Sequence, residues 1–160
     1  MLVDFNELPD HSRIWIYQSN RSFSESELLE IEQSMSEFLK QWTAHGSDLH
    51  AGFEIKYNRF IVVGLDQTNA SASGCSIDAS VHFIQMLEKK FQVELLDRMN
   101  VSFKQGEFIA YKPLMDFKKM AKAKAVSANT IVFNNLVATK QEYIENWEVP
   151  ASESWHSRFV

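Results

Sequence analysis

Apolar and polar side chains follow a strand-like pattern at three places in the first half of the chain. Residues 13–18 (R-I-W-I-Y-Q) and 51–57 alternate with a period of two, whereas 59–65 is apolar almost throughout. Alternating β-branched and aromatic residues predict strands, and the short interval at 57–59 predicts that the second and third strands form a hairpin. Because the strand at 59–65 is apolar on both faces, we expect it at the centre of a sheet.

Two longer stretches carry apolar residues at intervals of three and four, the spacing of an amphipathic helix. The first opens at Ser24, which forms a capping box with Glu27, and is expected to end near Trp42. Gly74, after a polar loop, leads into the second, with Ser76 as its expected N-cap. We interpret both apolar stripes as core-facing; they consist of Leu28, Ile31, Met35, Phe38 and Trp42 in the first helix, and Ile77, Val81, Ile84, Leu87 and Phe91 in the second.

The remainder of the chain predicts five further elements. Residues 101–112 are expected to form a second hairpin that turns at Gly106, where glycine tolerates a positive φ. A helix follows from Pro113, a residue that suits the first turn, to about residue 124. The apolar stretch at 130–137 predicts a strand, and a capping box that begins at Thr139 predicts a short helix.

The order of elements is therefore β-α-β-β-α-β-β followed by α-β-α. Its first six elements match the split βαβ, or ferredoxin-like, arrangement, an antiparallel sheet with two helices on one face. We predict an α+β fold with a ferredoxin-like βαββαβ core at about 13–112 and a C-terminal α-β-α extension at about 113–160. No linker or shift in composition divides the chain, so 1–160 is expected to form a single domain.

Composition and charge narrow the classes of partner. The chain has 160 residues, 45% of them hydrophobic, which is enough for a core of its own. A net charge of −5 argues against nucleic acid as a partner. Residues 112–124 nevertheless hold five lysines and one aspartate, whereas 24–41 holds five glutamates and one lysine. The basic helix could bind phosphates or an acidic partner, and the acidic helix of a second copy could be that partner in a homodimer. A solvated lysine face over Leu114, Phe117 and Ala121 is the simpler interpretation.

Three features predict a cytoplasmic protein. The longest apolar run, 60–65, is far shorter than the about 20 residues of a membrane span, so no membrane partner is expected. The single cysteine, Cys75, cannot form an internal disulfide, and the N-terminal residues have neither the basic nor the apolar region of a secretory signal.

The start of the second predicted helix is the principal candidate for a ligand site. A loop of small and hydroxyl-bearing residues ends there, and the first N–H groups of a helix attract anions. The candidate ligand-binding residues, two of them from the loop at 43–50, are Ser73, Gly74, Cys75, Ser76, Asp78, His45 and Asp48. They predict a module that binds a small anionic molecule or another protein.

Cys75 is also a candidate catalytic nucleophile, because the field at a helix start favours the thiolate. A hydrolase or transferase built on it needs a base, and His45 and His82 are the candidates. The two histidines and the aspartate within 45–50 match no standard zinc spacing, and we predict neither a metal nor another cofactor.

Four segments carry a resemblance to known proteins: 8–21 (L-P-D-H-S-R-I-W-I-Y-Q-S-N-R), 42–49 (W-T-A-H-G-S-D-L), 73–80 (S-G-C-S-I-D-A-S) and 147–159 (W-E-V-P-A-S-E-S-W-H-S-R-F). In these segments the chain resembles an uncharacterised family of small bacterial proteins that often carry the label "ABC transporter ATPase". The resemblance implies a bacterial cytosolic protein. The label implies ATP hydrolysis, but the chain has no G-x-x-x-x-G-K-[ST] loop and no lysine after Gly74, which excludes a P-loop ATPase.

Overall fold

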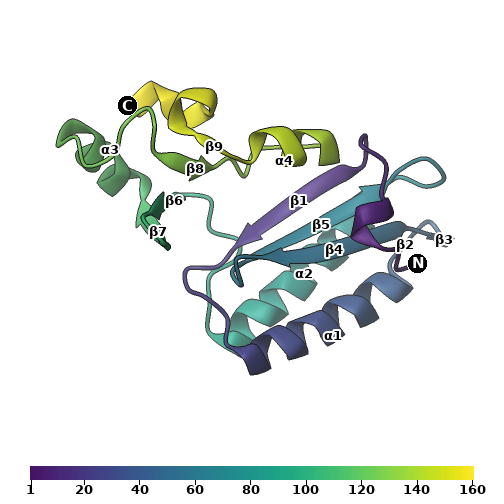
Figure 1. Ribbon diagram of the computed structural model, residues 1–160. Coiled ribbons are helices and arrows are strands. Elements are labelled where there is room, and N and C mark those ends of the chain that lie inside the picture. Colours follow the sequence, from purple (N-terminus) through teal and green to yellow (C-terminus); the bar gives the residue numbers. More distant parts are fainter. The chain divides into compact units, whose positions relative to one another are not determined.

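The computed structural model describes all 160 residues and has a mixed α+β fold with antiparallel sheets, as predicted (Figure 1). The chain divides into two compact units, Met1–Leu96 with Ala138–Gln141, and Asp97–Val137 with Glu142–Val160. The continuous part of the first unit therefore ends at residue 96, whereas the predicted core extended to about 112. The expectation that 1–160 folds as a single domain stays a prediction.

The first unit is a three-stranded sheet with two long helices on one face (Figure 1). Its strand order is β1-β5-β4, so β5 is central as predicted, and six of its seven residues are buried. The helices are α1 and α2. The elements are η1 (Phe5–Glu7), β1 (Arg13–Gln18), α1 (Glu25–Gln41), β2 (Thr43–Ala44), β3 (Ser47–Asp48), β4 (His50–Lys56), β5 (Phe60–Asp66) and α2 (Gly74–Phe91).

Local sequence explains where α1 begins. The hydroxyl of Ser24 accepts a hydrogen bond from the Glu27 N–H, and the Glu27 carboxylate accepts one from the Ser24 N–H, which is the predicted capping box. On the inner side, α1 buries Ile31, Met35 and Leu39 against the sheet. The predicted stripe followed the 3–4 spacing alone and therefore omitted Leu39. An apolar helix face is about 100° wide, so it also includes positions beside that stripe.

The face of the sheet opposite the helices is covered in part by the η1 segment. A Cβ atom on Gly64 of β5 would lie 2.6 Å from Leu8 Cδ1, so the Leu8 side chain packs directly on the strand at this glycine and would have to shift for a larger residue. The ammonium of the buried Lys140 donates to the carbonyl oxygens of Asn6 (3.0 Å) and Leu8 (2.7 Å). Lys140 therefore anchors the segment that covers Gly64.

The predicted ferredoxin-like core is incomplete, because its sixth element does not join the first sheet. The strand β6 (Asn100–Gln105) belongs to a separate four-stranded sheet of order β7-β6-β8-β9. In the first unit, residues 138–141 lie along the outer edge of β1 instead. The Ile14 N–H donates to the Ala138 carbonyl at 2.9 Å, and the backbones of Arg13 and Thr139 form an antiparallel β-bridge. Alternation along a strand predicts its faces but not its neighbour, which depends on tertiary pairing.

The second unit has its own core, made of Val101, Phe103, Phe117, Val126, Val132 and Ala151. The predicted strand at 130–137 is shorter than expected, and the strand β9 was missed because three residues are too few to show a period. Trp155 and Phe159 pack against the core, as expected for the tail. The elements after β6 are β7 (Phe108–Pro113), α3 (Leu114–Lys122), β8 (Ile131–Phe133), α4 (Lys140–Asn146), β9 (Glu148–Pro150), η2 (Ala151–Glu153) and η3 (Trp155–Phe159).

None of the helices combines the length and the apolar character that a membrane crossing requires.

Candidate functional site

The start of α2, the predicted anion site, is closed by its own side chains. Ser73, and not Ser76, is the N-cap: its hydroxyl accepts from the Ser76 N–H at 3.1 Å, and the Ser76 hydroxyl accepts from the Ser73 N–H at 2.7 Å. The predicted N-cap was three residues too late, because Ser76 occupies the third helical position, where it replaces the usual Glu or Gln of a capping box.

Ser76 is buried and joins the two helices. Its carbonyl oxygen accepts a hydrogen bond of 2.8 Å from the indole Nε1 of the buried Trp42, the residue that ends α1. By contrast, Gly74, Cys75 and Asp78 are exposed on the outer side of the same turn. Of the predicted residues at this turn, Ser73 and Ser76 therefore bond to each other in the cap, and Gly74, Cys75 and Asp78 face outward.

The structure does not bring Cys75 into a catalytic arrangement. The thiol is exposed, and neither His45 nor His82 forms a hydrogen bond with it. His82 lies seven residues further along α2, a distance of about 10 Å along a helix axis. A base must be within hydrogen-bond reach of the nucleophile that it activates, and this requirement is not met here.

The loop with His45 and Asp48 has a structural role. His45 (φ 51°) and Gly46 (φ 79°) form the two-residue turn between β2 and β3, in which Ala44 pairs with Ser47. A positive φ at both central positions is the signature of a type I′ hairpin turn. No group of three or more His, Cys, Asp or Glu side chains anywhere in the protein is arranged to hold a metal ion.

A polar cluster that sequence reasoning did not assemble lies at the end of β5. The Thr68 hydroxyl donates to the Asp66 carboxylate at 2.6 Å, and the Thr68 N–H donates to it at 3.0 Å. These hydrogen bonds, with a smaller contribution from His11 and His50, lower the pKa of the Asp66 carboxyl. Because the Thr68 hydroxyl gives its proton to Asp66, His11, 3.3 Å from that oxygen, does not activate it as a nucleophile.

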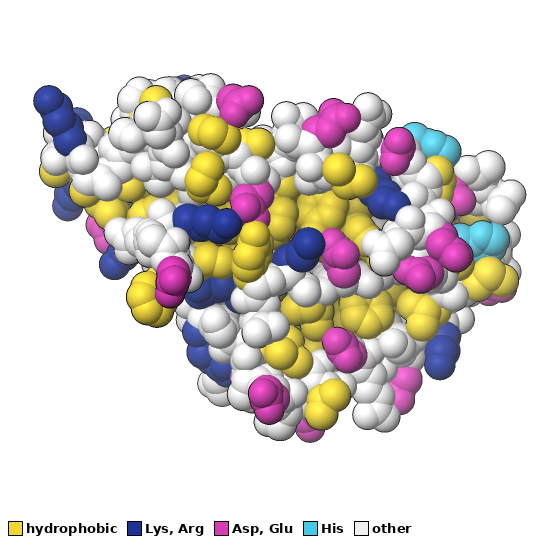
Figure 2. Space-filling view, in the orientation of Figure 1, with side chains coloured by type: hydrophobic (Ala, Val, Ile, Leu, Met, Phe, Trp, Pro, Cys, Tyr) yellow, Lys and Arg dark blue, Asp and Glu magenta, His cyan; other side chains and the backbone are white.

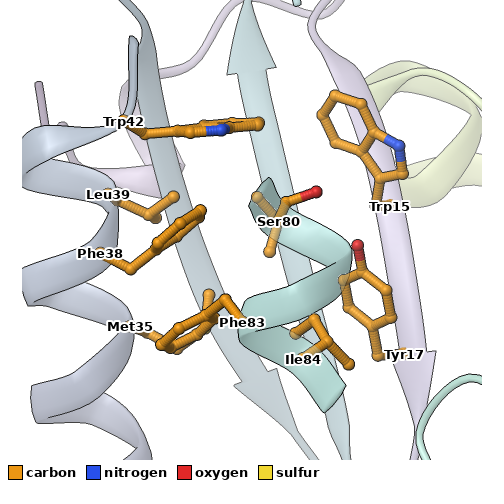
Figure 3. Close-up of a pocket in the computed structure, with 10 residues that line it drawn as sticks. Trp15, Tyr17, Met35, Phe38, Leu39, Trp42, Ser80, Phe83 and Ile84 are labelled. Carbon is orange, nitrogen blue, oxygen red and sulfur yellow. The ribbon is translucent and has the colours of Figure 1, made fainter. Parts of the chain in front are cut away.

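The most distinctive feature of the first unit is an aromatic cleft between α1, α2 and the sheet (Figure 3). Side chains of α1 line one side and those of β1 the other, and α2 lies between them (Figure 3). The residues that line the cleft are Trp15, Tyr17, Met35, Phe38, Leu39, Trp42, Val63, Ser80, Phe83 and Ile84. The sequence analysis assigned the α1 and α2 stripes to the core and did not predict an opening between them.

The aromatic rings of the cleft form a continuous series of contacts. Phe38 of α1 and Phe83 of α2 stack with their centroids 4.6 Å apart and an interplanar angle of 10°. Trp42 meets Phe38 at 5.8 Å and, edge to face, Trp15 at 5.9 Å. Trp15, Phe38 and Phe83 are half-exposed, whereas Trp42 is buried. The rings therefore form a partly open apolar wall.

The cleft is narrow in this conformation. Its free interior is about 10 Å³, room for about one water molecule, and the unfilled space is about 270 Å³ when the open mouth is included. Ligand pockets typically occupy about 300 to 1,000 Å³. A ring-sized ligand would therefore have to part the Phe38–Phe83 stack.

A cationic group lies against Trp15, one of the rings that line the cleft. The guanidinium carbon of Arg13 lies 4.5 Å from the centroid of the Trp15 ring, and Arg13 has no ion-pair partner. Contacts run from Arg13 through Trp15 and Trp42 to the Ser76 carbonyl at the start of α2. The mouth of the cleft is thus connected to the helix start that the sequence singled out.

Compared with known proteins, the chain matches no family model, no curated protein and no solved structure. The resemblance to the small bacterial proteins stays a prediction.

Proposed function

We propose that the protein is a binding module without P-loop chemistry, whose ligand is a small molecule with an apolar body and an anionic group. The apolar body enters the aromatic cleft, and the anionic group lies beside Arg13 and the first turn of α2. The observation that carries this proposal is the cleft itself, a contiguous aromatic wall with three half-exposed rings, Trp15, Phe38 and Phe83. Concave apolar surfaces with a few polar groups at the rim are the usual form of small-ligand sites.

The energetics favour the apolar part as the main source of affinity. An exposed helix terminus contributes about 0.3–1 kcal/mol to an anion, whereas a micromolar ligand needs about −8.2 kcal/mol. A ligand group that removes roughly 200 Å² of apolar surface from water contributes about 5 kcal/mol. The anion therefore orients the ligand, and the rings of the cleft hold it.

A pair of fluorescent dyes tests both parts of the proposal. 1-Anilinonaphthalene-8-sulfonate is an aromatic anion, and N-phenyl-1-naphthylamine has the same ring system without the sulfonate. Both dyes are expected to bind the native protein and to quench the tryptophan emission, since Trp15 and Trp42 line the cleft. Arg13→Gln should weaken the sulfonate dye and leave the uncharged dye unchanged.

A variant that fills the cleft supplies the control for non-specific dye binding. Ser80→Phe places a ring inside the cleft and should abolish the binding of both dyes. Ala79→Phe adds the same bulk to the exposed side of α2 and should leave binding unchanged. Dye binding that survives Ser80→Phe in a protein with native circular dichroism would place the dyes elsewhere and contradict the proposal.

The alternative function, a hydrolase or transferase with Cys75 as nucleophile, has one supporting observation, the exposure of the thiol. A thiol-directed reagent separates it from the binding module. Because no base contacts Cys75, we expect labelling of the native protein at the rate of a cysteine in a short unstructured peptide. A much faster reaction near neutral pH would favour the enzyme.

A further inference from the structure

The second unit carries a concentration of cations that the fold does not neutralise. Figure 2 shows Lys and Arg side chains gathered over the part of the molecule that holds α3. The lysines at 112–124 and Arg158 have no ion-pair partner; they are Lys112, Lys118, Lys119, Lys122, Lys124 and Arg158. We call them the basic surface. Two of them, Lys118 and Arg158, flank the ring of Phe159 at 4.9 and 5.6 Å.

The outward stripe of α3 combines charge with an exposed apolar side chain. Met115, Lys119 and Lys122 follow one another at intervals of four and three and are all exposed, so they share one side of the helix. Met115 is 62% exposed, whereas Phe117 on the inner side of the same helix is fully buried. The stripe offers one apolar contact point with lysines on the same face.

The helix α1 has an outward stripe of the same form and the opposite sign. Glu25, Leu29 and Glu32 follow one another at intervals of four and three, and all are exposed, with Leu29 at 70%. Neither Glu25 nor Glu32 has an ion-pair partner. Glu27 and Glu30, by contrast, already meet Arg21 and Lys90.

We propose that two copies of this chain pair reciprocally, the basic surface of each docking the acidic α1 stripe of the other, with Met115 against Leu29 and lysines against Glu25 and Glu32. The charge distribution argues for a second copy over a polyanion. The first unit has eight basic and fourteen acidic residues, −6, and the second unit eight basic and seven acidic, +1. A second copy brings complementary charge to the surface, whereas a nucleic acid would be repelled by the larger part of the molecule.

Sedimentation equilibrium of the full chain at low and high salt tests the proposal. We expect a dimer at 20 mM salt that dissociates at 500 mM. The distance over which salt screens a charge falls from about 30 Å at 0.01 M to about 3 Å at 1 M, so the attraction between exposed charges is much weaker at the higher concentration. Lys119→Glu with Lys122→Glu should abolish the dimer. The matched control, Lys56→Glu with Lys89→Glu, changes the net charge equally at exposed lysines outside the basic surface and should keep it.

Restoration by charge exchange distinguishes docking from a general effect of charge. A chain with Lys119→Glu, Lys122→Glu, Glu25→Lys and Glu32→Lys should dimerise again, because the two stripes have exchanged signs. A native chain that is monomeric at both salt concentrations overturns the proposal. A monomer that binds single-stranded DNA through the lysines also overturns the proposal, because the basic surface would then bind a polyanion and not a second copy.

Discussion

The guanidinium of Arg21 donates two hydrogen bonds to the carboxylate of Glu27, at 2.8 and 2.9 Å, and a third to the Phe91 carbonyl at 2.7 Å. Glu27 belongs to the first turn of α1, and Phe91 is the last residue of α2. Arg21 therefore joins the start of one helix to the end of the other, on the same side of the sheet. This contact helps to fix the relative position of the helices that border the aromatic cleft.

The contact between Arg21 and Glu27 predicts that the stability of the protein falls at low pH. Hydrogen bonds from Arg21, and then from the Ser24 N–H, lower the pKa of the Glu27 carboxyl from 4.5 to about 2. The folded state therefore gains stability from the carboxylate above pH 4.5, and this contribution is lost as the pH falls from 4.5 toward 2. Because Arg21 is partly exposed, we expect Glu27→Gln to lower the free energy of unfolding at pH 7 by only about 1–2 kcal/mol. Urea unfolding at pH 7 and pH 2.5 measures it; an equal loss at both values would contradict the role of the charge.

His156 predicts a second pH dependence, at a higher pH. Burial lowers the pKa of its imidazole from 6.5 to about 4; the Ser154 hydroxyl lies 2.6 Å from Nδ1, and Nε2 has no partner. The unfolded chain binds this proton below pH 6.5 and the folded protein only below about 4, so stability is complete above pH 6.5 and decreases toward pH 4. The loss amounts to about 3 kcal/mol. Thermal unfolding between pH 4 and 7 should show it in the native protein and in His82→Gln, a control at an exposed histidine, and a weaker slope in His156→Phe.

Replacing glycine with alanine is expected to have opposite effects on stability at two positions. A Cβ atom on Gly52 would lie 2.6 Å from the Val3 carbonyl oxygen and 2.9 Å from the Phe5 N, both backbone atoms that cannot move aside. A Cβ atom on Gly74, at the start of α2, would meet nothing within 4 Å. We expect Gly52→Ala to destabilise the protein by about 1–3 kcal/mol and Gly74→Ala to stabilise it by about 0.4–1 kcal/mol. Chemical denaturation of both variants checks the pair, and a neutral Gly52→Ala would show that the N-terminal segment is not held against β4.

Substitution of Lys140 is expected to lower stability through the loss of hydrogen bonds to backbone carbonyls. Its ammonium is buried and donates to the carbonyl oxygens of Asn6 and Leu8. Lys140→Met keeps most of the apolar stem but leaves both carbonyls without this donor, which we expect to cost about 1–3 kcal/mol. Lys118→Met, at a partly exposed lysine of α3, is the control. Amide hydrogen exchange should rise at residues 5–8 in the first variant alone; unchanged protection there would argue against the anchoring role.

Local signals were sufficient for most elements of the first unit. The strand at 13–18 and the Ser24–Glu27 capping box were predicted at the residues where they occur, because both depend on neighbours within a few positions. Ser76 was misassigned as an N-cap because a serine at either position can cap a helix, and only the backbone geometry distinguishes them.

The candidate site could be predicted only in part. The start of α2 was identified, but His45 forms a tight turn, Cys75 has no base, and the aromatic cleft was taken for ordinary core. Helical spacing shows which side chains of α1 and α2 face inward. Whether the two apolar stripes close on each other or leave an opening depends on how the helices are placed on the sheet, which the spacing does not contain.

The sequence by itself determined the α+β class, the positions of the main helices and strands, the central place of the 59–65 strand and the opposite charges of the acidic and basic helices. All of these follow from the periodicity or composition of residues close together in the chain. Only the tertiary structure decided that β6 leaves the first sheet, that residues 138–141 meet β1, and that Trp15, Trp42 and Phe83 line one cleft. Each of these depends on which distant segments pair and pack, and long-range pairing leaves no periodic trace in a single sequence.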